Sequence, residues 1–130
     1  MQPKALKVVL AGFVLLVIAG PVWAHHSVSA EFDVNQPIEF TGKVQQVNWL
    51  NPHIYTLVTV TEADGSEITY RVEGSAPNSL FRRGWRKDTM APGQQVTVEG
   101  IRAKNPDSMA VGSATITTEE GTRVFSGSAN

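Results

Sequence analysis

The stretch His53-Ile-Tyr-Thr-Leu-Val-Thr-Val-Thr-Glu-Ala-Asp-Gly-Ser-Glu-Ile-Thr-Tyr-Arg-Val-Glu73 decides the fold class. Two runs rich in β-branched and aromatic residues, His53–Thr61 and Glu67–Glu73, flank Ala63-Asp64-Gly65-Ser66. Asp-Gly tolerates positive φ at little cost, so this centre predicts a tight turn between two paired strands. The sequence therefore predicts a β-hairpin here.

The same alternation of apolar and polar residues extends in both directions from the hairpin. It predicts further strands over Pro37–Leu50, Gln94–Ala103 and Met109–Thr118, with Gly42 as a bulge or kink in the first. Residues 75–84 have a helix pattern, with Ser75 as the N-cap and Gly84 as the C-cap. Three strands, one short helix and two strands predict an all-β, OB-like five-stranded Greek-key barrel, with a small open β-sandwich as the alternative.

The first 24 residues have the pattern of a cleaved signal peptide. Lys4 and Lys7 precede an apolar run, and Val22-Trp23-Ala24 suits a signal peptidase. We therefore expect three parts: signal peptide 1–24, an N-terminal arm 25–36 and a single domain 37–127. The expected location is the periplasm of a Gram-negative bacterium or the medium, without a stable membrane anchor after cleavage; an uncleaved N-terminal anchor is the alternative.

Net charge and composition limit the classes of molecule that we expect the protein to bind. After loss of Lys4 and Lys7 the chain keeps nine of its 11 basic side chains against 12 acidic ones, a formal charge of −3, and it has no cysteine. Such a chain has no general attraction to nucleic acid or anionic lipid and forms no disulfide. We expect an envelope protein or a small ligand as partner, and no nucleic acid.

Several motifs together resemble a known family. They are His25-His26-Ser27, Glu31-Phe32-Asp33, Trp49 with Asn51-Pro52-His53, Arg82-Arg83-Gly84-Trp85, Pro92-Gly93, and Val98-Glu99-Gly100 with Arg102-Ala103-Lys104. In this order they are similar to a family of small exported bacterial proteins, domain of unknown function 6152. The resemblance implies a small, exported, single-domain protein and no particular activity.

The three histidines, His25, His26 and His53, are candidate metal ligands. Cleavage after Ala24 makes His25 the first residue, so its α-amine and ring nitrogen can chelate one ion, and a second imidazole completes three nitrogens. This set resembles the histidine brace of secreted copper proteins, and nitrogen ligands favour Cu(II). A solvated His-His tail and a His53 that bonds its own turn are the competing interpretations.

A second candidate site combines aromatic and basic residues. Arg82, Arg83 and Trp85 belong to a run with four cations in six residues, suited to a carboxylate, phosphate or sulfate group. Trp49 and Tyr55 on neighbouring strands are candidates for a stacking platform. A helix C-terminus that favours cations, and packing of the aromatic rings in the core, are the alternatives.

Together these patterns predict an exported, non-catalytic binding module that holds copper through His25. The alternatives are a structural or protein-interaction module of the cell envelope and, third, a small copper-dependent oxidase. No nucleophile elbow, phosphate loop or HExxH motif occurs in the sequence.

Overall fold

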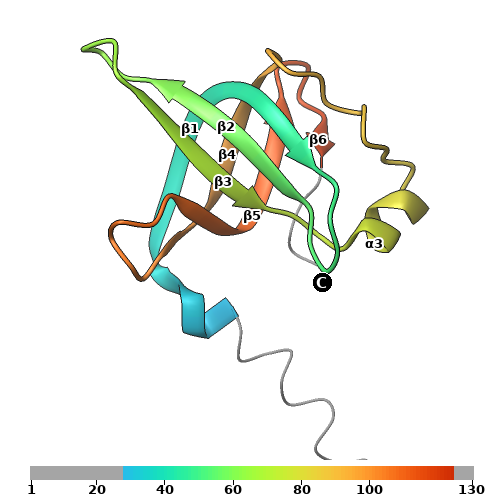
Figure 1. The fold of residues 1–130 in the computed structure, drawn as a ribbon, viewed down its shortest axis with the longest axis horizontal. Coiled ribbons are helices and arrows are strands. Elements are labelled where there is room, and N and C mark those ends of the chain that lie inside the picture. The colour runs from blue at the N-terminus through green and yellow to red at the C-terminus, as the bar shows by residue number, and fades with distance from the viewer. Residues whose placement is uncertain (1–27, 125–130) are drawn as a thin grey trace, which may run out of the picture. The chain divides into compact units, whose positions relative to one another are not determined.

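The alternating segments of the sequence form the strands of one sheet in a computed structural model that describes residues 28–124. A helical turn over 28–31 precedes the first strand. The elements are β1 (Phe32–Asn48), β2 (Tyr55–Thr61), β3 (Glu67–Glu73), α3 (Pro77–Arg82), β4 (Gln95–Ala103), β5 (Ala110–Thr118) and β6 (Arg123–Val124) (Figure 1).

The sheet closes on itself. Its strand order is β3-β2-β1-β4-β5-β6, and β3 also pairs with β5. The neighbours in the order are antiparallel, whereas β3 and β5 are parallel, through Arg71↔Ala110 and Val72↔Val111. Five strands therefore form a ring, with the short helix between the third and fourth. The prediction of an all-β domain with one short helix is confirmed, and five of its strands form a ring.

Strand β1 connects the two sides of the ring. Its first part pairs with β4 up to Lys43↔Gln95, and its last part pairs with β2 from Lys43↔Thr59 onward. Gly42 lies just before this change of partner, where a Cβ atom would lie 2.6 Å from the Thr59 carbonyl oxygen. Glycine therefore permits the close approach of two strands here, while the ladder irregularity lies between Val44 and Gln46. Figure 1 shows β1 curving over the ring.

Strand β1 also begins earlier than the sequence pattern indicates. It starts at Phe32, inside the segment expected to be an arm, and its register with β4 shifts between Phe32 and Pro37. In the interruption, Asp33 accepts hydrogen bonds from the Asn35 backbone (3.0 Å) and the Gln36 side chain (3.0 Å). This local turn breaks the period-two pattern, which explains why sequence alternation starts only at Pro37.

The predicted hairpin turn between β2 and β3 is confirmed. Gly65 has a φ of 86°, and the Glu62 amide donates to the Ser66 carbonyl at 2.8 Å. The Asp64 carboxylate accepts from both the amide and the hydroxyl of Ser66.

The interior of the ring holds the main apolar core, to which every strand and the helix contribute. Trp49 and Trp85 are partly buried and pack against it. Its buried members are Ile38, Val44, Ile54, Val58, Val72, Leu80, Met90, Val96, Val98, Val111, Ala114, Ile116 and Val124. A second, smaller cluster of Phe32, Ala103 and Ala110 fixes the start of β1. The first residue of the sheet is thus held by packing.

A substitution at Gly112 on β5 tests how tightly Phe32 packs in that second cluster. A Cβ atom at Gly112 would lie 2.6–2.8 Å from three atoms of the Phe32 ring. We expect Gly112→Ala to lower the free energy of unfolding by about 1–3 kcal/mol, the usual cost of overpacking, in a urea titration. In a Phe32→Leu background the loss should shrink, because the ring that collides is gone. An equal loss in both backgrounds would contradict this explanation.

Candidate functional site

The candidate site is built around α3, which begins later than the sequence indicates. The N-cap is Ala76, with φ −64° and ψ 145° and no side-chain cap bond. Ser75, the predicted N-cap, is buried, and its carbonyl oxygen accepts a hydrogen bond from the Ile54 amide at 3.2 Å. The N-cap prediction was wrong because the backbone of Ser75 continues the pairing of β2 and β3, while Pro77 starts the helix without needing a donor.

At the other end of α3 the C-cap is Arg83, not Gly84 as predicted, and Gly84 is the next residue. Gly84 has a φ of 91°, and its amide donates to the Phe81 carbonyl at 3.1 Å. The Trp85 amide donates to the Leu80 carbonyl at 3.0 Å. This pair of bonds is the Schellman arrangement, in which the residue after the glycine also packs on the last turn. Trp85 is therefore directed at the core, together with Leu80.

Arg86 extends this helix end. Its Nη1 donates to the carbonyls of Phe81 (3.1 Å) and Trp85 (2.8 Å), and its backbone amide donates to Thr89 Oγ1 (2.8 Å). Its guanidinium carbon lies 3.8 Å from the centre of the Phe81 ring. The cation and the aromatic ring thus hold each other in place at the surface, and the phenyl side chain remains 57% exposed.

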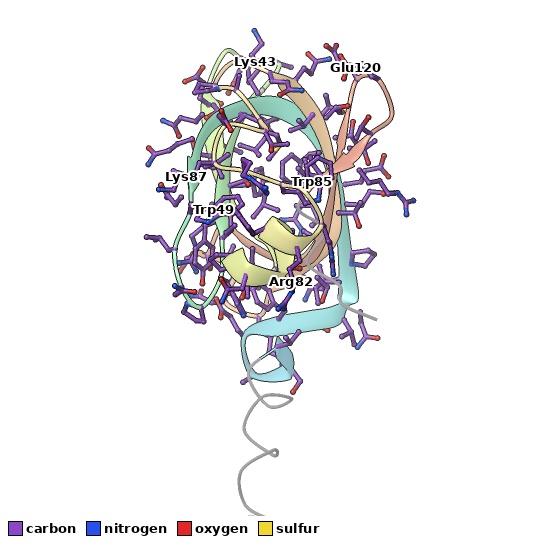
Figure 2. All side chains as sticks on the ribbon, turned by 90° about the vertical axis from the view of Figure 1, so that its right-hand side faces the viewer. Lys43, Trp49, Arg82, Trp85, Lys87 and Glu120 are labelled. Atoms are coloured by element: carbon purple, nitrogen blue, oxygen red, sulfur yellow. The ribbon has the colours of Figure 1, made fainter. Side chains whose placement is uncertain are left out.

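A groove lies between this helix end and the loop from β1 to β2. It has a volume of about 670 Å³ and is lined by Trp49, Phe81, Arg86, Lys87 and Asp88. Figure 2 shows Trp49 and Lys87 beside α3, with Arg82 and Trp85 around the same helix. Its volume falls in the range of small-molecule sites, roughly 300–1,000 Å³.

The charge around the groove is opposite to that of the rest of the protein. Residues 82–88 hold four cations and one carboxylate, all exposed. The remainder of residues 28–124 holds five cations and 11 carboxylates. A local excess of positive charge on an otherwise acidic chain raises the concentration of anions at that position.

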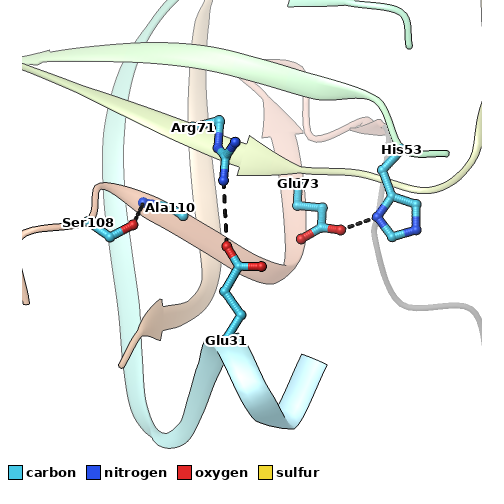
Figure 3. Close-up of polar contacts among 6 residues, drawn as sticks. All are labelled: Glu31, His53, Arg71, Glu73, Ser108 and Ala110. Carbon is cyan, nitrogen blue, oxygen red and sulfur yellow. Dashed lines mark hydrogen bonds and ion pairs between the residues drawn. The ribbon is translucent and has the colours of Figure 1, made fainter. Parts of the chain in front are cut away.

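His53 lies in the same β1–β2 loop as Trp49, two residues before β2, but it does not line the groove. It follows a cis Asn51–Pro52 peptide bond, and its Nδ1 contacts the Glu73 carboxylate at the end of β3 (Figure 3). The His53 side chain is 41% exposed and that of Glu73 is 20% exposed. A carboxylate at Nδ1 orients the ring so that Nε2 is the nitrogen available to a ligand.

Tyr55 continues the face that carries Glu73, its cross-strand partner. The Arg71 guanidinium lies 4.8 Å from the centre of the Tyr55 ring, and its Nη2 lies 3.5 Å from a Glu31 carboxylate oxygen (Figure 3). Burial raises the pKa of the Tyr55 phenol above its ordinary value of 10.0, and the nearby Glu73 carboxylate adds to this.

The structure distributes the residues singled out in the sequence over distinct surroundings. Trp49 lines the groove, whereas Tyr55 lies against Arg71, so the two belong to different clusters. Arg82 and Arg83 are exposed at the end of α3, and Trp85 is packed on the core.

Two important residues were missed in the sequence. Phe81 directly precedes the basic run, and this position beside several cations could have identified it as a candidate site residue. Glu73 has no local signal, because its contact with His53 depends on strand register.

Of the three candidate metal ligands, the structure describes only His53. His25 and His26, like the predicted signal peptide, lie outside the described residues. Within residues 28–124, no group of three or more His, Cys, Asp or Glu side chains is placed to hold a metal ion. In the same described stretch, none of the helices has the length and apolarity that crossing a bilayer requires.

Comparison with known proteins identifies one family whose model matches this chain. The model of a family described as "Family of unknown function (DUF6152)" matches residues 12–113. Neither a curated protein nor a solved structure matches the chain.

The raised pKa of Tyr55 gives a direct spectroscopic prediction. The chain has two tyrosines, so in a Tyr70→Phe variant the tyrosinate absorbance reports Tyr55 alone. We expect its titration midpoint to lie above 10.0 and to fall in Tyr70→Phe/Glu73→Gln, because the second cause of the shift is removed.

The raised pKa of Tyr55 also determines whether stability rises or falls with pH. As pH rises through 10.0, the unfolded chain loses this proton before the folded one, so stability falls and Tyr55→Phe removes that part of the fall. A midpoint at or below that of a free tyrosine amide would contradict the assignment.

Proposed function

Since the chain belongs to the family of unknown function DUF6152, we propose its role from its own chemistry: an exported, non-catalytic module that binds a small ligand in the groove beside α3. The observation that carries this proposal is the groove of about 670 Å³ between Trp49 and the α3 end. Export to the periplasm or beyond is supported by the signal-like pattern of residues 1–24.

The position of the groove in the fold supports a binding role. Trp49 belongs to the loop between the first two strands, and this loop is one of those that OB-fold proteins use for ligands. Large apolar side chains remain at the surface nearby, with Phe81 57% and Leu50 55% exposed. Aromatic walls with a few fixed polar groups are typical of ligand sites.

The ionisable groups that line the groove support binding rather than catalysis. They are Arg86, Lys87 and Asp88. Arg86 is engaged in ending the helix, and the lining has no hydroxyl or thiol nucleophile beside a base. The groove is suited to attract and orient a molecule.

A fragment screen tests this proposal. We expect soluble aromatic fragments to shift the indole N–H resonance of Trp49 and the amide of Phe81 in two-dimensional NMR spectra. Phe81→Ala should weaken the hits at least about threefold, because the phenyl ring supplies one wall.

The control is Val34→Ala, which also shortens an apolar side chain that is 69% exposed but lies outside the groove. It should leave the affinities unchanged. Hits that map to other surfaces, or an equal effect of both variants, would refute the groove as the binding site.

Copper is a second candidate ligand, favoured by the contact between His53 and Glu73. A metal-bound histidine commonly has a carboxylate at its other ring nitrogen, which fixes its orientation. Glu73 is in this position relative to His53, and the ring is 41% exposed. The other nitrogens would be those of His25, with His26 adjacent in sequence, as the sequence predicts.

This second candidate is tested by calorimetric titration of Cu(II) into protein whose first residue is shown by mass spectrometry to be His25. We expect submicromolar binding that weakens at least tenfold, about 1.4 kcal/mol, in His53→Ala. Glu73→Gln should also weaken it, by about tenfold or more, because the ring loses its orientation.

Glu62→Gln, in the distant hairpin turn, serves as the carboxylate control and should have no effect. One residue added ahead of His25 should abolish the site by displacing the amine. Weak binding that none of these changes alters would mean a solvated His-His tail and would exclude the site.

A further inference from the structure

The groove beside α3 has features that select one class of ligand. We infer that it binds a small organic anion with a single negative charge and a flat apolar body, such as an aromatic carboxylate. This inference rests on the proposed binding function and specifies its ligand.

The flat body follows from the walls. Trp49 and Phe81 provide an indole and a phenyl ring from segments far apart in the sequence. The Arg86 guanidinium carbon lies 3.8 Å from the centre of the Phe81 ring, and this cation–π contact restrains the ring at the surface. Rigid aromatic walls favour planar apolar groups, which stack on them with little loss of conformational entropy.

The negative charge follows from the cations. Lys87 forms no hydrogen bond or ion pair with another residue in the described part of the chain, so its ammonium group is available to a ligand. Arg86 uses Nη1 for two carbonyl oxygens and keeps the donors on Nε and Nη2. Because its guanidinium is already held in place, a ligand carboxylate would meet a preorganised donor.

The inference that the ligand has only one negative charge follows from Asp88. It lines the same groove as Arg86 and Lys87, so the lining carries two cations and one carboxylate. Arg82 and Arg83 do not line the groove, so the lining has one net positive charge, which is matched by a monoanion, while the second charge of a dianion would face Asp88. The volume of about 670 Å³ accommodates a body of one or two rings.

The experiment compares two probes of equal shape and different charge. The affinities of 2-naphthoate and uncharged 2-naphthylmethanol are measured for the purified protein by calorimetry. We expect naphthoate to bind about fivefold more tightly, the effect of one charge pair near a surface. Lys87→Gln should remove most of this preference and leave the affinity of the alcohol unchanged.

Lys43→Gln is the matched control, since Lys43 is also exposed and lies away from α3 (Figure 2). It should keep the preference for naphthoate. Added salt should reduce the preference in the wild type and have little effect in Lys87→Gln, because it screens the charge pair.

The possible failures are distinguishable. Equal affinities for both probes, each reduced by Phe81→Ala, would overturn the anion inference and leave the proposed binding function intact. A preference for naphthoate that Lys43→Gln lowers as much as Lys87→Gln would overturn the assignment to this groove. Absence of binding by either probe would overturn the inference, and the fragment screen would then decide the proposed function separately.

Discussion

The fold depends on one strand that serves two partners. β1 pairs with β4 along its first part and with β2 along its last part, and the change occurs next to Gly42. At this position the Thr59 carbonyl approaches so closely that any side chain would collide with it. Because the same strand belongs to both sides, β3 and β5 meet in parallel and the ring encloses the core. The loop that carries Trp49 and His53 follows directly from the end of β1.

The groove is a consequence of how α3 ends. The bonds that close the helix at Gly84 direct Trp85 toward the core and leave Phe81 at the surface. Arg86 then satisfies carbonyl oxygens at the helix end and stacks on the same phenyl ring. One set of hydrogen bonds therefore supports both helix termination and a rigid aromatic and cationic surface. This explains why a basic run after a helix, favourable in itself, can also form a ligand site.

The two candidate sites differ in electrostatic character. Around α3, cations exceed carboxylates, and the side chains suit an organic anion. Around His53, Glu73 contacts the histidine, and the neighbouring Tyr55 lies against Arg71, which forms an ion pair with Glu31. An imidazole oriented by a carboxylate suits a metal ion better than an anion. The two sites share the β1–β2 loop, but the residues substituted in their tests, Phe81 and Lys87 for the groove and His53 and Glu73 for copper, belong to one site each.

The sequence by itself determined which segments form strands and which form the helix, but not all of their ends. Period-two alternation, the Asp64-Gly65 turn and Gly84 identified the strands, the hairpin and the helix end, because these signals act between near neighbours. The start of β1 was not predicted, because the turn around Asp33 interrupts the alternation of apolar and polar residues. Ser75 is not the N-cap, because its backbone pairs with Ile54 instead.

Contacts between distant segments were decided only by the tertiary structure. The Glu73 partner of His53 and the meeting of Trp49 with Phe81 depend on register and closure of the ring, which no local pattern encodes. Of the residues named individually from the sequence, Trp49 lines the proposed groove and His53 belongs to the proposed copper site, while the fold brought Phe81 to the first and Glu73 to the second.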